Sequence, residues 1–329
     1  MRAFEYASPK SKEQAVALLG KSWNDAQVLA GGTDLLSLMK DDVVAPKRVV
    51  NLKGVEELRG IRFDPRNGLR LGALVTWHEV LDDANIRRHY PSLHAAAGEI
   101  GGPQIRSVGT VGGNLCQRPR CWYYRGGFGL LGQAQGGRSM VVDGENRYHA
   151  ILGNEGPAYF VSPSTMAPLL IALGATVSLF GPEGAREVPV EKFFRVPRTS
   201  EEREHDLAPG EIVTEVRVPA SSARSANYEV REKEGLDWPI VTAAVALRMS
   251  GSTVQSARVV LGHVAPVPWP SPEAEAALAG KVVSEAVAQA AGDAAVRRAR
   301  ALSGNGYKLQ LARVAVKRAV LAAAGGGAR

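Results

Sequence analysis

The sequence predicts an α+β protein with more than one domain, because 329 residues are long for a single hydrophobic core. A short apolar strand at 27–30 runs through two glycines into a helical pattern, which is typical of an α/β unit. Alternating polar and apolar residues at 211–219 and 227–233 predict antiparallel strands. The alanine-rich segment from residue 271 onward has helical spacing and predicts helices packed on a sheet.

Composition and charge indicate a globular protein that does not bind nucleic acid. Hydrophobic residues make up 45% and charged residues 22%, as in soluble globular proteins. The net charge of +7 comes from 40 basic and 33 acidic residues without a polybasic run, so we expect a surface for an acidic partner or phosphates and no nucleic-acid binding. No signal-like apolar region and no apolar run of membrane length occur. We therefore expect no membrane association and a cytoplasmic location, with export alongside a signal-bearing partner left open.

The first 60 residues predict a small α/β domain. Strands are expected at 4–6, 27–30 and 47–52. Ser11, with Gln14 three residues later, predicts the start of a helix at 12–19. Apolar residues at 35–39 predict a second helix, which places Asp34 at its N-terminus. Asp34 would either cap that helix or contact a ligand, for example ribose hydroxyls.

Residues 61–220 predict a second α+β domain, and residues 221–329 a third. In the second, strands at 69–73, 176–180 and 211–219 accompany helices that begin near residues 76 and 91. In the third, strands at 227–233, 241–249 and 254–263 predict a three-stranded antiparallel meander. Three short helices follow, with breaks expected near Gly280, Gly292 and residues 303–306.

Two glycine-rich turns carry the functional signal. The first is VLAGGTDL at 28–35 and the second is QIRSVGTVGGN at 104–114. Glycine permits positive φ and lets the backbone approach a ligand closely, so two such turns could hold one diphosphate from both sides. Neither turn fits the G-x-G-x-x-G or P-loop pattern. Taken alone, each would be an ordinary tight turn.

Taken together, AGGTDLL and IRSVGTVGGN, about 75 residues apart, resemble the FAD-binding medium subunit of molybdenum hydroxylases. That family includes xanthine dehydrogenases, aldehyde oxidoreductases and carbon monoxide dehydrogenases, and the resemblance covers nearly the whole chain. It implies an FAD-binding fold of the PCMH (vanillyl-alcohol oxidase-like) type in two α/β subdomains, 1–60 and 61–220. It also implies a C-terminal domain like that of the carbon monoxide dehydrogenase flavoprotein at 221–329.

The resemblance implies a set of FAD contacts. In the family both turns hold the FAD pyrophosphate, and His149 and Ile151 are expected at the edge of the isoalloxazine ring. His149 could equally be a buried structural histidine. Lys233 stands where many relatives have arginine and would touch the flavin or its phosphate, or else be a solvated lysine. The expected cofactor-binding residues are Leu29, Ala30, Gly31, Gly32, Thr33, Asp34, Ser107, Thr110, Gly112, Gly113, Asn114, His149, Ile151 and Lys233. Many relatives also have an aspartate where this chain has Thr165.

The only two cysteines, Cys116 and Cys121, lie in a segment that resembles bacterial aldehyde oxidoreductase medium subunits. Some members of that subgroup carry a four-iron cluster there, with further cysteines in the following loop. Residues 126–143 contain no cysteine in this chain. Two thiolates cannot supply four ligands, so we expect no iron–sulfur cluster on this chain. Cys121 is then a packed thiol or a remnant ligand.

The resemblance implies an electron-transfer subunit of a heterotrimeric oxidoreductase. A molybdenum cofactor is expected on a large molybdopterin-binding partner and two-iron clusters on a small partner. FAD on this chain would pass the electrons to NAD or another acceptor. No residues in the sequence predict a general acid or base. Two other hypotheses remain: a scaffold subunit that has lost FAD, and a free-standing flavin oxidase.

Overall fold

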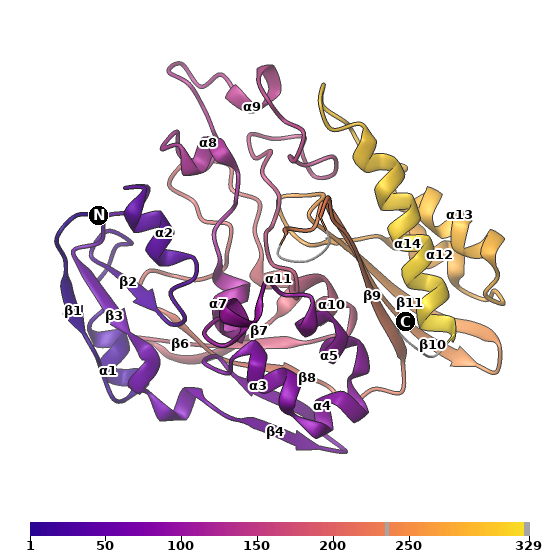
Figure 1. Ribbon diagram of the computed structural model, residues 1–329, viewed down its shortest axis with the longest axis horizontal. Helices are drawn as coiled ribbons and strands as arrows, with labels where there is room; N and C mark the ends of the chain where they lie inside the picture. Colours follow the sequence, from indigo (N-terminus) through magenta and orange to yellow (C-terminus); the bar gives the residue numbers. More distant parts are fainter. Residues whose placement is uncertain (234–236, 326–329) are drawn as a thin grey trace.

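A computed structural model of the chain describes residues 1–233 and 237–325. Three β-sheets follow one another along the sequence and are arranged from one end of the molecule to the other (Figure 1). Helices accompany each sheet, so the predicted α+β class is confirmed. Among the described residues, no helix combines the length and apolar character that crossing a membrane requires.

The first sheet contains three parallel strands in the order β1-β3-β2. Its helix α1 begins after Ser11, whose Oγ accepts a hydrogen bond from the backbone N–H of Gln14 (3.2 Å). Burial of Ala15, Val50 and Leu52 forms its small core. Its elements are β1 (Glu5–Ala7), α1 (Lys12–Ala17), β2 (Ala26–Leu29), α2 (Leu35–Lys40) and β3 (Arg48–Asn51), followed by the 3-10 turns η1 (Leu52–Gly54) and η2 (Glu56–Leu58).

The second sheet contains five antiparallel strands in the order β4-β5-β8-β6-β7. A long helical insertion between β5 and β6 carries the second glycine turn. Thr76 and Glu79 form the capping box that starts α3. The strands are β4 (Ile61–Asp64), β5 (Gly68–Gly72), β6 (Thr176–Gly181), β7 (Gly184–Pro189) and β8 (Ile212–Val218). The helices are α3 (Trp77–Asp82), α4 (Ala84–His89), α5 (Pro91–Gly98), α6 (Pro103–Arg106), α7 (Val111–Cys116), α8 (Trp122–Arg125), α9 (Met140–Asp143), α10 (Ala167–Ala172) and α11 (Val190–Phe193).

The third sheet corrects the predicted three-stranded meander. It has four strands in the order β12-β11-β10-β9, because Val260 and Leu261 pair with the two residues of β12. Prolines surround β12, so its sequence shows no strand alternation. The elements are β9 (Arg224–Val230), β10 (Val241–Ser250), β11 (Thr253–Gly262), β12 (Trp269–Pro270), α12 (Pro272–Leu278), α13 (Glu285–Ala295) and α14 (Tyr307–Gly325).

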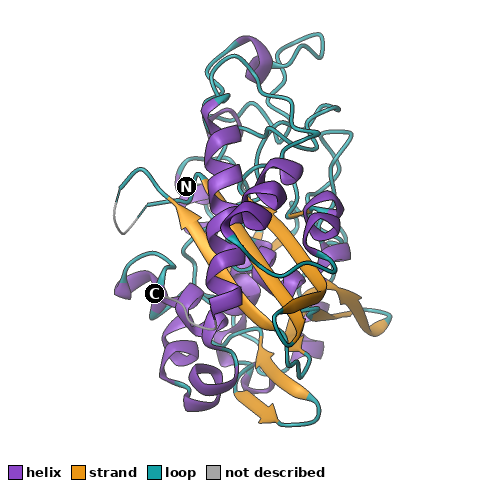
Figure 2. Cartoon of the chain, turned by 90° about the vertical axis from the view of Figure 1, so that its right-hand side faces the viewer, coloured by secondary structure: helices purple, strands orange, loops and turns teal. Residues whose placement is uncertain are grey.

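The C-terminal helices cover one face of this sheet, and the long α14 lies along the strands (Figures 1 and 2). The break predicted near Gly292 is wrong, because Gly292 lies inside α13. A Cβ at Gly292 would lie 2.4 Å from the carbonyl oxygen of Arg313 in α14. This glycine therefore permits close helix packing and does not end the helix.

Candidate cofactor-binding site

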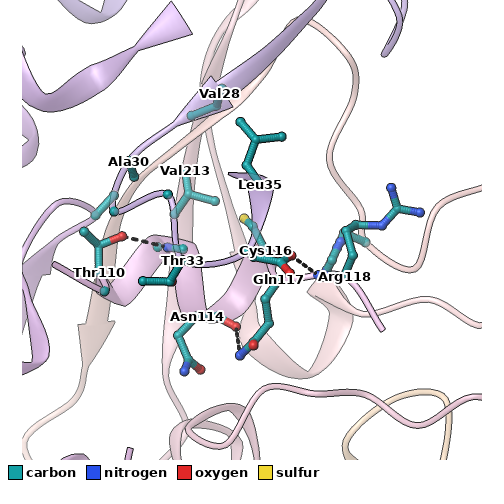
Figure 3. A pocket seen from close by; sticks show the side chains of 18 of the residues that line it. Val28, Ala30, Thr33, Leu35, Thr110, Asn114, Cys116, Gln117, Arg118 and Val213 are labelled. Atoms are coloured by element: carbon teal, nitrogen blue, oxygen red, sulfur yellow. Dashed lines mark hydrogen bonds between the residues drawn. The ribbon is translucent and has the colours of Figure 1, made fainter. Parts of the chain in front are cut away.

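The two glycine turns meet at a cavity of about 440 Å³, within the usual range for a cofactor site. Its walls come from all three sheet regions, including Trp23 of the first and residues 237–239 of the third. Figure 3 shows Ala30 and Thr33 of the first turn beside Thr110 of the second. Of the residues expected to bind the cofactor, nine line this cavity: Ala30, Gly31, Gly32, Thr33, Asp34, Thr110, Gly112, Gly113 and Asn114.

The first turn leaves the end of β2 and packs backbone to backbone on the second. A Cβ at Gly31 would lie 2.1 Å from the carbonyl oxygen of Val108. No side chain fits in this gap, so glycine is required for the two turns to touch. Gly32 has φ +79°, a left-handed conformation that glycine adopts without strain.

Backbone hydrogen bonds hold the second turn against the segment that follows β5. The N–H of Val111 donates to the carbonyl of Val75 (2.8 Å), and the N–H of Gly112 donates to Ala73 (2.9 Å). Thr110 then caps α7, because its Oγ1 accepts a hydrogen bond from the N–H of Gly113 (3.1 Å). This brings the start of α7 to the wall of the cavity.

Gly113 and Gly112 are glycines for different reasons. A Cβ at Gly112 would lie 2.9 Å from the Cβ and 3.1 Å from the carbonyl oxygen of Ala73, so Gly112 is needed for packing. Gly113 is exposed at the cavity, and a Cβ there would meet one atom within 4 Å, the Oγ1 of Thr110 at 2.8 Å. Glycine at this position therefore keeps a side chain out of the cavity and off the capping hydroxyl.

The Asn114 side chain is fixed from the segment that contains Thr165. Asn114 Oδ1 accepts a hydrogen bond from Ser164 Oγ (2.8 Å), and its Nδ2 donates to Thr165 Oγ1 (3.3 Å). Thr165 also lines the cavity. At Thr165, where the resemblance implied an aspartate, the structure has a hydroxyl that orients Asn114.

The predicted helix cap at Asp34 is wrong, because its side chain makes no capping hydrogen bond. Its carboxylate instead accepts the backbone N–H of Arg118 (2.8 Å) and pairs with the guanidinium groups of Arg120 (2.9 Å) and Arg125 (2.7 Å). Three positively polarised groups outcompete the helix N-terminus for one carboxylate. Asp34 therefore ties the first turn to the segment that follows α7.

Sequence reasoning missed the basic groups of the cavity wall, Arg118, Arg120 and Arg203. Arg118 forms a buried ion pair with Glu204. Arg120 lies over the ring of Trp238, with its guanidinium carbon 4.5 Å from the ring centroid. Two of these arginines stand in the sequence RPRCWYYR at 118–125, whose density of basic residues was the available signal.

Five expected residues lie outside the cavity lining. Leu29 ends β2, and Ser107 donates its hydroxyl hydrogen bond to the Gln104 carbonyl (2.9 Å). Lys233 is exposed at the edge of the described residues. His149 and Ile151 are buried at the junction with the C-terminal domain, where Ile151 belongs to the core of the third sheet.

Lys308 holds this junction together. Its buried Nζ donates to the backbone carbonyls of Tyr148 (3.2 Å), His149 (3.2 Å) and His263 (2.6 Å). His149 Nε2 in turn lies 3.1 Å from the sulfur of Cys121. The hydrogen bonds from Lys308 therefore hold the segment around His149 against the start of α14.

A pH dependence of stability follows from the two histidines at this junction. Burial, reinforced by the Lys308 charge, lowers the pKa of His149 to about 4 and that of His263 to about 3, from 6.5. Below pH 6.5 the unfolded chain binds protons that the folded chain cannot, so the free energy of unfolding falls as the pH drops toward 4. Each histidine contributes at most about 1.4 kcal/mol per pH unit.

His263→Asn should reduce this slope, because asparagine tolerates the φ of +62° at this position and does not titrate. Urea unfolding of both proteins at pH 7 and pH 5 measures the difference. Equal slopes for the wild type and the variant would contradict a neutral, buried His263.

The two cysteines are free thiols. Cys116 lines the cavity, and burial raises its pKa to about 12, so it is present as the neutral thiol. Within residues 1–233 and 237–325, no group of three or more His, Cys, Asp or Glu side chains is arranged to hold a metal ion.

Comparison with known families shows which family the chain belongs to. Residues 2–221 match the family described as FAD binding domain in molybdopterin dehydrogenase. The chain belongs to this family. Residues 226–323 also match the carbon monoxide dehydrogenase flavoprotein C-terminal domain. The chain is therefore an FAD-binding medium subunit of the molybdenum hydroxylase family, an oxidoreductase subunit, and the predicted resemblance is confirmed.

Individual members of the molybdenum hydroxylase family are similar over nearly their whole length. The carbon monoxide dehydrogenase medium chain of Hydrogenophaga pseudoflava is 32% identical over 97% of this chain and 96% of its own. The aldehyde oxidoreductase FAD-binding subunit PaoB of Escherichia coli is 32% identical over 95% and 96%. Among solved structures, carbon monoxide dehydrogenase from H. pseudoflava superposes with a TM-score of 0.77 at 32% identity, over 99% of both chains. Quinoline 2-oxidoreductase from Pseudomonas putida 86 gives 0.76 at 27% identity, over 99% and 98%.

The residues of the cavity fit FAD. Glycine at 113 keeps the exposed cavity wall free of a side chain, and arginines beside the turns offer positive charge for an anionic cofactor. When bound, FAD supplies the redox chemistry, and the protein holds and orients it. The membership in a flavoprotein family does not favour the scaffold or the free-standing oxidase.

Proposed function

We propose that this subunit binds the diphosphate of FAD between its two glycine turns. The observation that carries the proposal is the backbone contact between Gly31 and Val108, which places both turns at one cavity. Ala30 to Asp34, with Thr110 and Gly112 to Asn114, would contact the cofactor or shape its site. Leu29 and Ser107 lie outside the cavity lining and would support the conformation of the two turns.

His149, Ile151 and Lys233 have a different place in this proposal. The first two side chains lie in the packed junction with the C-terminal domain, and Lys233 is exposed. We assign His149 and Ile151 to support of the site, and we leave Lys233 as a solvated lysine. The domain limits proposed from the sequence, 1–60, 61–220 and 221–329, each contain all the strands of one sheet.

We further propose that the subunit functions within a heterotrimer. Relatives are named as medium chains, which supports a large and a small partner. The large partner would bind the molybdopterin cofactor and the small partner two-iron clusters. FAD here would receive their electrons and pass them to NAD or another acceptor. The two free thiols agree with the cytoplasmic location that the sequence suggests.

Reconstitution tests the proposed function. The isolated, FAD-loaded chain should not turn over an organic substrate with an artificial electron acceptor. Adding the large and small partner chains should produce substrate-dependent reduction of the flavin. Omitting each partner in turn is the control, since either omission should interrupt electron flow. Substrate-dependent flavin reduction by the isolated chain would contradict the proposal and favour a free-standing oxidase.

A further inference from the structure

Arg120 lies in the cavity wall in an incompletely paired state. Its Nη1 lies 2.9 Å from Asp34 Oδ1, its Nη2 donates to Gln117 Oε1 (3.1 Å), and its guanidinium lies over Trp238. Its Nε is buried and has no hydrogen-bond partner among the described residues. Burial lowers the pKa of Arg120 to about 10, which leaves the guanidinium charged at neutral pH. The protein therefore leaves this guanidinium incompletely satisfied.

The charges around Arg120 do not cancel. Arg118 is paired with Glu204, whereas Arg120 and Arg125 share the single carboxylate of Asp34. These three arginines face two carboxylates, so one positive charge is in excess. Arg125 is the better satisfied of the two that share Asp34, because it also donates to the backbone carbonyls of Pro119 (2.9 Å) and Arg118 (3.0 Å). The excess charge is therefore located at Arg120.

Trp238 indicates which part of a bound FAD would face Arg120. The indole is 44% exposed and adjoins the cavity, which gives it a flat apolar surface. A fused aromatic ring can pack against such a surface, whereas a diphosphate gains nothing from it. In the proposed function the diphosphate lies at the glycine turns, and either fused ring of FAD, adenine or isoalloxazine, could pack on Trp238. Only the isoalloxazine ring gains negative charge on reduction, so it is the ring that the excess charge of Arg120 favours.

We propose that Arg120, positioned by Asp34 and Trp238, contacts the isoalloxazine ring of bound FAD and raises its reduction potential. Two-electron reduction with uptake of one proton leaves a negative charge on the ring, and a nearby cation stabilises that charge. The inference rests on the proposed function, because it requires FAD in this cavity. Under this proposal, part of the reduction potential of the flavin is set by Arg120, a residue outside both glycine turns.

The test is the midpoint potential of the flavin in the FAD-loaded chain, measured by titration with a redox dye. In Arg120→Gln the ratio of reduced to oxidised flavin at fixed potential should fall at least about tenfold, equivalent to about 30 mV for a two-electron couple. Arg120→Lys keeps the charge and should retain most of the potential.

Arg138→Gln is the matched control, because Arg138 is 76% exposed and pairs with Asp143 outside the cavity lining. It should leave the potential unchanged. An unchanged potential in Arg120→Gln would overturn the proposal. So would weaker FAD binding with an unchanged potential in the flavin that remains, since that result assigns Arg120 to the diphosphate. A wild-type chain without FAD would instead overturn the proposed function, so the two failures are distinguishable.

Discussion

Gly113→Val is expected to weaken FAD binding at least about thirtyfold while the chain stays folded. Gly113 lies within α7 without a positive φ, so valine is compatible with the backbone. Its side chain would project into the cavity, and its Cβ would shift the hydroxyl of Thr110, which would lie only 2.8 Å away. Overpacking costs about 2 kcal/mol, which corresponds to about thirtyfold in affinity. Titration of the cofactor-free protein with FAD, followed by fluorescence, measures the effect.

Gly156→Val provides a matched control. Gly156 is also exposed and has open space around its Cα, but it does not line the cavity. It should bind FAD like the wild type. Gly32→Val should also lose FAD, but its φ of +79° strains the turn itself, so it is the less specific change. If Gly113→Val binds FAD with wild-type affinity, the second turn has only a structural role.

Asp34→Asn is expected to lower the free energy of unfolding by about 2 kcal/mol. Asparagine keeps the shape of the side chain but leaves Arg120 and Arg125 without their shared carboxylate. Removing one partner of a buried ion pair costs about 3–5 kcal/mol, and partial exposure of these side chains reduces that cost. Chemical unfolding of the cofactor-free chain measures the change.

Asp41→Asn serves as its control, because Asp41 ends the same helix, is exposed and forms no ion pair among the described residues. It should unfold like the wild type. If Asp34→Asn keeps full stability but loses FAD, Asp34 contacts the cofactor directly and does not organise the arginines. This comparison therefore separates the two roles that a carboxylate in the first turn could have.

The predicted fold depended on local patterns that the structure retains. The strand at 27–30 and the helix after Thr33 are set by apolar periodicity and the glycine turn, and both occur close to their predicted bounds. β12 could not be predicted, because two residues among prolines carry no alternation. Gly292 resembled a helix break because the contact that requires it, with Arg313, is distant in sequence.

In the site, too, the features set by local sequence could be predicted, and those set by contacts between distant segments could not. The two glycine turns are local motifs, and their sequences indicated a shared ligand. The convergence of Arg118, Arg120 and Arg125 around Asp34 depends on contacts across more than 80 residues, which the sequence alone does not reveal. His149 was an ambiguous residue for the same reason, since its neighbours Cys121 and Lys308 come from distant segments.

The visible absorption spectrum of the purified wild-type chain, which is the reference for the Gly113 comparison, tests the central claim most directly. We expect flavin bands, about one FAD released per chain and no broad iron–sulfur absorption. A folded chain that stays colourless after incubation with FAD would contradict the assignment of the cavity to this cofactor. About four irons per chain would contradict the expectation that this subunit carries no cluster.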